Sequence, residues 1–520
     1  MYINGEWTEI KTGQIVDDLT PADGSLFSRV YTAGEKETDM KEYKMYINGE
    51  WTETKTGQIV DDLNPADGSL FARVHTAGER ETEAALAAAA DAFMGWSSLL
   101  ASQRERVLLQ AADNIEAIQE EAIEILIEEA GSTFMKAKGE ISGAANTLRI
   151  AAGECRRVEG EVLQPTSTGQ LSLSVRVPLG VVAAIAPFNF PINITMKKIA
   201  YAMAIGNTIV LKPASYTPAT GYLVAKIFEM AGLPAGVLNV IPGPGSVVGD
   251  RLVEDPRVKC ITFTGSSTVG RSIAAKAAKN LKKYAMELGG KNPLIVLKDF
   301  DATKAAEIAG YGAFYNQGQT CIATARVIVE DPLYDAVCEQ MIKRAKGIKV
   351  GDPHEKDTIV GPLIHPSQCD FIDGQIKDAV SKGAKVLYGG THEGSFFQPT
   401  VLADVTPEMD IFYQESFGPI VSIFRAKDSI HALELANDNE YGLSSSILTN
   451  DLNLALQLGL KMQAGMVHVN DSTVVSTSGT APSGGVKMSG FGKESGKFSV
   501  DAYSDLKWVT LQYTDKKMIV

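Results

Sequence analysis

The sequence predicts an α/β protein built around a parallel sheet that helices cover on both faces. Residues 181–186 form an uninterrupted apolar run, as in a strand that is buried on both faces. Similar runs follow at 208–211, 237–241 and 259–263, with helical stretches between them. This alternation indicates a parallel sheet, and such sheets bind ligands at the carboxyl ends of their strands.

Length and composition limit the class of protein. The chain has 520 residues, too many for a single core, so we expect two or three domains. Its 45 % hydrophobic and 22 % charged residues are ordinary for a soluble globular enzyme. The net charge of −14 argues against nucleic acid and membranes as partners.

Cysteine and histidine usage predicts neither disulfides nor a metal site. The five cysteines are odd in number, widely spaced and without a Cys-x-x-Cys pair, which fits a reducing cytoplasm. The six histidines show no ligand spacing, so no metal is expected. The N-terminus lacks the pattern of a signal peptide, and no apolar run is long enough to span a bilayer. We therefore expect a cytoplasmic protein.

The first 83 residues contain a tandem repeat. Residues 1–39 recur at 45–83, and only six of the 39 pairs differ. A solenoid needs more copies than two. We interpret residues 1–44 as a duplicated, weakly docked extension; the alternative is an extra arm for oligomer assembly.

Helical and strand patterns flank the predicted parallel sheet. Helices are expected at about 81–96, from Ser102 to about Gly131, and at about 133–157. Glu105, three residues after Ser102, suggests a capping box. Residues 170–177 and 506–513 read as half-buried strands.

The candidate chemistry centres on Cys321 and Glu287. Cys321 ends the stretch Phe-Tyr-Asn-Gln-Gly-Gln-Thr-Cys, and Glu287 lies in Met-Glu-Leu-Gly-Gly-Lys-Asn-Pro. A thiol attacks carbonyl carbon, and a nearby carboxylate can accept its proton. A lone cysteine is more often a small buried hydrophobe, and a lone glutamate a surface charge, but here each lies in a complete glycine-bearing motif.

Both motifs resemble segments of the aldehyde dehydrogenase superfamily. The resemblance covers about residues 45–515 and six motifs, the last being Gly484-Gly-Val-Lys-Met-Ser-Gly490. It implies a Rossmann-like parallel-sheet cofactor domain, an α/β catalytic domain and a small oligomerisation β-sheet. The expected boundaries are 1–44 for the extension, 45–159 and 179–289 for the NAD(P)-binding domain, 290–488 for the catalytic domain, and 160–178 and 497–520 for the oligomerisation segments.

The resemblance assigns the catalytic roles. Cys321 adds to the aldehyde carbon, Asn189 in Pro-Phe-Asn-Phe-Pro steadies the oxyanion, and Glu287 activates the water that hydrolyses the thioester to an acid. Without the other motifs, Asn189 would be read as an ordinary Asx turn before Pro191. Lys198 and Glu494 match a charged pair that relays protons behind Glu287, although alone they would be read as a simple ion pair.

Three loops at the strand ends suggest a nicotinamide cofactor. They are 212–215, the glycine-rich 243–249, and 263–266, which opens a helix. The glycine spacing alone is weak evidence. Through the resemblance, the cofactor-binding residues are Phe188, Lys212, Ser215, Gly245, Gly265, Ser266, Leu288, Glu415 and Phe417. Family members specific for NAD often carry glutamate at position 215, so Ser215 predicts a preference for NADP, with NAD possible.

The aldehyde itself stays open at this point. Residues 470–474 and 505–512 resemble the branch that oxidises benzaldehyde, vanillin or salicylaldehyde, and Ser483 replaces a common aromatic residue. The expected tunnel positions offer little aromatic surface, which keeps lactaldehyde and succinic semialdehyde as alternatives: Gly143, Asn193, Thr320, Ile322 and Thr477. A coenzyme A-acylating enzyme is a further alternative, against which Glu287 counts. An idle binding protein on this fold is another, against which the intact Cys321, Glu287 and Asn189 count. We expect a homodimer or homotetramer.

Overall fold

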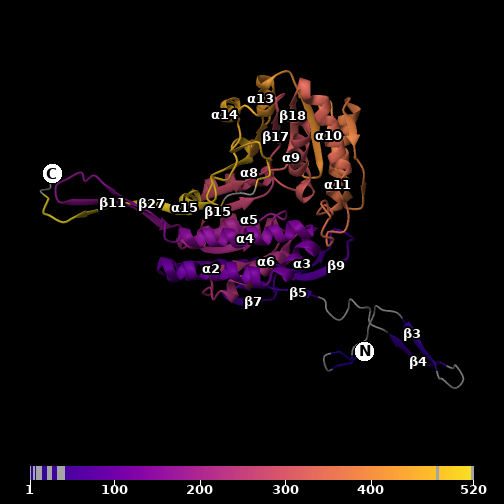
Figure 1. Cartoon of the computed structure of the whole chain (residues 1–520). Coiled ribbons are helices and arrows are strands. Elements are labelled where there is room, and N and C mark those ends of the chain that lie inside the picture. The colour runs from indigo at the N-terminus through magenta and orange to yellow at the C-terminus, as the bar shows by residue number, and fades with distance from the viewer. Residues whose placement is uncertain are drawn as a thin grey trace.

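The computed structural model describes residues 41–475 and 479–516, together with four short strands within the first 40 residues. Two α/β bodies lie against each other, and a narrow arm of strands projects from one of them (Figure 1). This architecture confirms the predicted α/β class.

The first body contains an eight-stranded sheet with the order β26-β16-β15-β12-β13-β14-β6-β7. Its five central strands are parallel, as the apolar runs predict. These are β12 (Val181–Ile185), β13 (Thr208–Lys212), β14 (Leu238–Val240), β15 (Val258–Thr264) and β16 (Lys283–Glu287). Short antiparallel strands complete the two edges: β6 (Met45–Ile47), β7 (Glu50–Thr52) and β26 (Gly490–Phe491).

Helices cover both faces of this sheet, and its middle strands β12, β13 and β14 are buried along their whole length. Around the sheet lie α1 (Glu79–Ser97), α2 (Ala101–Ala117), α3 (Gln119–Ala130), α4 (Phe134–Glu154), α5 (Asn193–Ile205), α6 (Pro218–Met230), α7 (Asp250–Glu254) and α8 (Ser267–Lys279). The capping box predicted at Ser102 and Glu105 is wrong. The helix begins one residue earlier, and Gln103 accepts a hydrogen bond from the backbone N–H of Leu100.

The second body contains a seven-stranded sheet with the order β19-β22-β23-β18-β17-β24-β25. Its strands are β17 (Asn292–Val296), β18 (Thr324–Glu330), β19 (Lys385–Tyr388), β22 (Thr400–Ala403), β23 (Ile420–Ala426), β24 (Ser444–Leu448) and β25 (Met466–Val469). The helices are α9 (Ala302–Phe314), α10 (Tyr334–Lys346), α11 (Pro366–Ser381), α12 (Asp410–Tyr413), α13 (Ser429–Asn437) and α14 (Leu452–Lys461). A small hairpin, β20 (His392–Glu393) with β21 (Phe396–Phe397), lies beside them.

The arm is a three-stranded antiparallel sheet. It consists of β10 (Glu161–Leu163), β11 (Gln170–Pro178) and β27 (Ser504–Gln512), and α15 (Gly496–Ala502) leads into it. β11 and β27 pair over nine residues, from Gln170↔Gln512 to Pro178↔Ser504. Apolar side chains on the arm are exposed, among them Val162, Leu506 and Trp508.

The second copy of the repeat packs against the first body. There β8 (Ile59–Leu63) and β9 (Leu70–His75) form a hairpin, and β5 (Lys41–Tyr43) runs parallel to β9. The strands of the first copy pair in the matching register: β1 (Tyr2–Ile3) with β2 (Glu6–Trp7), and β3 (Ile15–Leu19) with β4 (Leu26–Tyr31). Tyr43 is buried against the ring of Tyr222, with 4.8 Å between ring centroids, so residues 41–44 belong physically to the body rather than to the extension.

Candidate active site

Two cavities meet at Cys321. The smaller has a volume of about 340 Å³ and the larger about 830 Å³. Cys321 and Thr264 line both of them. Because Thr264 ends β15, the shared point lies at the carboxyl ends of the parallel strands, where the sequence predicts ligand binding.

The loop before Cys321 has a strained backbone. Asn316, Gln317 and Gly318 have φ values of 51°, 55° and 68°, which place three successive residues in the left-handed region. A Cβ atom on Gly318 would lie 2.0 Å from the carbonyl oxygen of Gly418, so only glycine fits there. Backbone strain of this kind persists where surrounding contacts over-determine the conformation.

Buried amide side chains supply those contacts. Gln317 donates from Nε2 to the carbonyls of Gly131 and Pro362, at 2.8 and 3.1 Å. On the other side of the loop, Asn292 Nδ2 donates to the carbonyls of Cys321 and Ala323, both at 2.8 Å. The thiol is therefore presented by a loop that both bodies hold in place.

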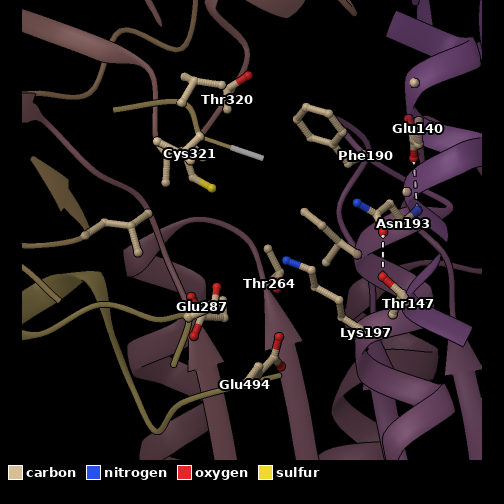
Figure 2. Close-up of a pocket in the computed structure, with 18 of the residues that line it drawn as sticks. Glu140, Thr147, Phe190, Asn193, Lys197, Thr264, Glu287, Thr320, Cys321 and Glu494 are labelled. Carbon is tan, nitrogen blue, oxygen red and sulfur yellow. Dashed lines mark hydrogen bonds between the residues drawn. The ribbon is translucent and has the colours of Figure 1, made fainter. Parts of the chain in front are cut away.

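Glu287 lies at the end of β16 and lines the smaller cavity with Cys321 (Figure 2). Burial and the neighbouring Glu494 raise the pKa of Glu287 to about 8, although Lys198 and Lys197 counteract the shift. A carboxylate in this range is a stronger base than an ordinary glutamate. The structure thus brings together the two residues that the motifs single out.

The surroundings of Cys321 favour the protonated thiol. Burial, Glu415 and Glu287 raise the pKa of Cys321 to about 12, and Lys197 acts in the opposite direction. A thiol with so high a pKa requires a base or an added positive charge to become a nucleophile. The other four cysteines are buried, and neither cavity is lined by any of them.

Asn189 is buried beside the nucleophile loop. Its Nδ2 donates to the carbonyl oxygen of Gln319 over 3.0 Å, and its side chain lines the larger cavity. An amide nitrogen carries two hydrogens, so the second remains available to another acceptor. The predicted donor therefore lies next to the thiol and is held there by the loop itself.

The predicted pair of Lys198 and Glu494 is present. Lys198 Nζ lies 3.2 Å from Glu494 Oε1 and 3.1 Å from Thr262 Oγ1, and both side chains are buried. Glu494 is aligned by backbone hydrogen bonds to and from Ser483, at 3.0 and 2.8 Å. Glu494 lines the smaller cavity, whereas Lys198 lies behind its wall.

A residue that the sequence analysis missed is Lys197, which lines the smaller cavity. Burial lowers its pKa, whereas Glu494 and Glu287 raise it. The signal that could have identified it is its spacing from Asn193. Residues four apart in a helix share a face, and Asn193 also lines this cavity.

The expected tunnel positions offer little aromatic surface themselves, but aromatic side chains from other positions line the smaller cavity. Phe190, Tyr311 and Tyr315 line it, and Phe190 and Tyr315 stack with ring centroids 6.2 Å apart. The expected positions Gly143, Asn193, Thr320, Ile322 and Ser483 are in the lining as well. Thr477 lies outside the described residues.

The larger cavity collects eight of the nine predicted cofactor residues: Phe188, Lys212, Gly245, Gly265, Ser266, Leu288, Glu415 and Phe417. The ninth, Ser215, is exposed and lies between two lining residues, Ala214 and Tyr216. His365 and Gln368, at the start of α11, also line the cavity and were not predicted.

The chemistry of the larger cavity fits a nicotinamide dinucleotide. Lys212 is buried at its wall, and burial alone lowers the Lys212 pKa to about 8. The N-terminus of α8, capped by Ser266, faces the same space, and helix N-termini favour phosphate. A Cβ atom on Gly245 would meet nothing within 4 Å, so there is open room at that backbone. Glu415, held by the N–H of Gly290 at 2.9 Å, supplies an acceptor for ribose hydroxyls.

Glu124, Glu128 and His354 lie together at the surface, outside the lining of both cavities. Among the described residues, none of the helices has the length and apolar character needed to cross a membrane.

Comparisons with known proteins agree with this geometry. Residues 51–509 match the aldehyde dehydrogenase family. The chain is 40 % identical to a vanillin dehydrogenase of Corynebacterium glutamicum over 433 residues, covering 83 % of this chain and 89 % of the relative. It is 36 % identical to a glutarate-semialdehyde dehydrogenase of Pseudomonas putida over 511 residues, covering 98 % and 97 %.

Among solved structures, a salicylaldehyde dehydrogenase from Pseudomonas putida G7 complexed with salicylaldehyde superposes with a TM-score of 0.90 at 35 % identity, covering 92 % of this chain and 99 % of that one. With a thiol and a carboxylate at one cavity and a dinucleotide-compatible cavity beside them, these matches show that the chain belongs to the aldehyde dehydrogenase family, the NAD(P)-dependent enzymes that oxidise aldehydes.

Proposed function

We propose that this chain oxidises an aromatic aldehyde to its carboxylic acid, with Cys321 as the nucleophile and NADP as the preferred cofactor. The observation that carries the proposal is the position of Cys321. Its thiol lies where a cavity that contains the buried carboxylate Glu287 meets a cavity that suits a dinucleotide.

In this mechanism Glu287 takes the proton of the Cys321 thiol, directly or through water. The sulfur then adds to the aldehyde carbon, and the second amide hydrogen of Asn189 and a backbone N–H near Cys321 stabilise the oxyanion. Donors at such positions contribute roughly 3 to 4 kcal/mol each to transition-state stabilisation. A nicotinamide bound in the larger cavity would accept the hydride from the aldehyde carbon, which leaves a thioester on Cys321.

Hydrolysis of the thioester completes the cycle. After Glu287 has passed the thiol proton onward, it removes a proton from water as the water oxygen adds to the thioester carbon, and it returns this proton to the Cys321 sulfur as the C–S bond breaks. Glu494 lies near Glu287 and is paired with Lys198, so this pair can pass the proton onward. Glu287 also favours hydrolysis, because transfer of the acyl group to coenzyme A would not require a base that activates water.

The aromatic class of substrate is supported by the walls of the smaller cavity. Phe190 and Tyr315 offer stacked rings, and Ile322, Leu443 and Met466 add apolar surface. The vanillin and salicylaldehyde dehydrogenases among the relatives act on aromatic aldehydes, which points in the same direction. Lactaldehyde and semialdehydes would use this aromatic surface less well.

The preference for NADP rests on position 215. Ser215 is exposed and adjacent to the lining of the larger cavity, so its neutral hydroxyl does not repel a 2′-phosphate. Lys212, three residues earlier, brings a positive charge to the same wall. Both features suit a phosphorylated ribose.

A homodimer or homotetramer is proposed from the arm. β27, which pairs with β11, exposes Leu506, Trp508 and Leu511, and an isolated sheet with so much exposed apolar surface needs a covering partner. We also propose the domain boundaries given above: 45–159 and 179–289 for cofactor binding, 290–488 for catalysis, and 160–178 and 497–520 for assembly.

A panel of aldehydes assayed with each cofactor tests the function. We expect NADPH formation with benzaldehydes at a higher kcat/KM than with lactaldehyde or succinic semialdehyde, and a free carboxylic acid as product with or without coenzyme A. A product that forms only when coenzyme A is present would contradict the hydrolytic mechanism. The absence of turnover with every aldehyde would contradict the function as a whole.

A further inference from the structure

We propose that Lys197 and Asn193 form a polar stripe on α5 that selects aromatic aldehydes carrying oxygen substituents, with Lys197 binding an oxygen next to the aldehyde group. The inference rests on the proposed oxidation of aromatic aldehydes at Cys321. Both residues line the smaller cavity, and they lie one helical turn apart on the same face of α5.

Lys197 and Lys198 have different surroundings although they are adjacent. Successive helical residues point about 100° apart, since a turn holds about 3.6 residues. Lys198 turns toward Glu494 and Thr262 behind the cavity wall. Lys197 extends past Thr264 into the cavity, and its ammonium lies on the side of Cys321 and Glu287 (Figure 2).

The position of Lys197 determines which substituent it can reach. The aldehyde carbon must lie at the Cys321 thiol, so a side chain at this end of the cavity meets atoms close to the aldehyde group. On a benzaldehyde ring, the nearest substituent is at the ortho position. An ammonium donates charge-assisted hydrogen bonds, and a phenolic oxygen is a good acceptor for them.

Asn193 forms the other end of the stripe, one helical turn before Lys197. Its Oδ1 accepts from Thr147 Oγ1 over 3.1 Å, which fixes the orientation of the amide. The Nδ2 atom then faces the cavity, as Figure 2 shows. A Cβ atom on Gly143 would come within 3.2 Å of Nδ2, so the small residue leaves the amide room beside a substrate. Because Asn193 is one helical turn from Lys197, it can reach oxygens at other ring positions, meta or para to the aldehyde group.

The charges around Lys197 favour neutral hydroxyl groups over carboxylates. Glu287 and Glu494 line the same cavity and are close enough to raise the pKa of Lys197. Glu140, also in the lining, is engaged by Lys136 at 2.6 Å. A substrate carboxylate would bring a further negative charge beside Glu494, and beside Glu287 once that group is ionised, whereas a phenol would not. The stripe therefore discriminates against semialdehyde acids.

Kinetics with matched aldehydes test the stripe. Wild type, Lys197→Met, Lys197→Arg and Asn193→Leu are assayed with 2-hydroxybenzaldehyde, benzaldehyde and 4-hydroxy-3-methoxybenzaldehyde. We expect wild type to favour 2-hydroxybenzaldehyde over benzaldehyde by about tenfold in kcat/KM, the equivalent of about 1.4 kcal/mol. Lys197→Met should remove most of this preference for 2-hydroxybenzaldehyde by raising its KM. Lys197→Arg should keep part of the preference. Asn193→Leu should weaken the use of 4-hydroxy-3-methoxybenzaldehyde most.

The following outcomes would contradict the inference. If Lys197→Met lowers kcat/KM equally for all three aldehydes, Lys197 serves the general chemistry and not selectivity. An absence of ortho preference in wild type would also contradict it. Titration of cofactor binding by each variant shows whether the protein is folded. A wild type that oxidises none of the aldehydes refutes the proposed function itself, which is a distinct result.

Discussion

Asn189 donates its side-chain amide to the carbonyl oxygen of Gln319 over 3.0 Å, and so joins the segment after β12 to the loop that carries Cys321. The first body supplies the donor, and the second body supplies the thiol. Because the bond crosses between the bodies, the geometry of the thiol depends on how they are packed together.

The role of Cys321 is tested by Cys321→Ala. We expect aldehyde oxidation to fall by at least about 10³-fold, as for the loss of other catalytic nucleophiles, while the cofactor still binds. Cys260→Ala is the matched control, since Cys260 is buried in β15 and does not line either cavity. Substantial NADPH formation by purified Cys321→Ala would refute the assignment.

The role of Glu287 is tested by Glu287→Gln. The amide keeps the shape but accepts no proton, so steady-state turnover should fall by about 10² to 10⁴-fold. Stopped-flow mixing should show a burst of NADPH followed by slow hydrolysis. Because the Glu287 pKa is raised to about 8, the basic form grows as the pH rises, and wild-type hydrolysis should accelerate between pH 7 and about 9. A variant with wild-type turnover would show that another group is the base.

Gly318 lies in the loop before Cys321, and Gly318→Ala tests how much this glycine contributes to the stability of the protein. Its φ of 68° and the 2.0 Å approach of a Cβ atom to the carbonyl of Gly418 make alanine unfavourable. The left-handed conformation alone costs about 1–2 kcal/mol, so the free energy of unfolding should fall by about 2 kcal/mol or more. Gly374→Ala, in α11 with open space around it, should instead be neutral or slightly stabilising in the same denaturant titration. Equal effects of the two substitutions would contradict the argument.

The N-terminal repeat is tested by two truncations. Deletion of residues 1–40 should leave activity and thermal midpoint unchanged, because the second copy already occupies the edge of the sheet at β14. Deletion of residues 1–44 should leave an active enzyme that is less stable by about 1–3 kcal/mol, since it also removes the buried ring of Tyr43. If the shorter truncation dissociates or precipitates, the first copy has a role in assembly.

The sequence predicts the structure correctly where a residue pattern is compatible with only one local structure. The apolar run before Pro187 became a central strand, and the motifs around Cys321 and Glu287 converge on one cavity. Hydrophobic burial and local backbone preference decide such elements, and both can be read along the chain.

The parts of the site that the sequence does not predict depend on how the helices and strands are rotated against one another. Lys197 and Lys198 are adjacent in the sequence, and the orientation of α5 places the first in the smaller cavity and the second against Glu494. Tyr315 and His365 reach the two cavities through the packing of the second body on the first. The helix start at Leu100 could not be predicted because leucine has no side chain that caps a helix; the Gln103 side chain accepts a hydrogen bond from the backbone N–H of Leu100 instead.

The cofactor preference is tested at Ser215. Ser215→Glu should turn the enzyme against NADP and toward NAD, because a carboxylate at this exposed position would face the 2′-phosphate. Like charges about 4 Å apart repel by about 4 kcal/mol at an effective dielectric near 20. Solvent reduces that value, but a tenfold loss requires only about 1.4 kcal/mol. With NAD the carboxylate can instead accept hydrogen bonds from the free ribose hydroxyls, so kcat/KM should hold or rise.

Ser215→Ala is the matched control for this substitution. It removes the hydroxyl without adding charge, so the ratio of kcat/KM for NADP to that for NAD should fall far less than in Ser215→Glu. Lys212 remains at the wall of the larger cavity in both variants and serves both cofactors. The measurement is that ratio for wild type and the two variants. An unchanged ratio in Ser215→Glu would show that position 215 does not face the 2′ position, and the preference for NADP would then lose its physical basis.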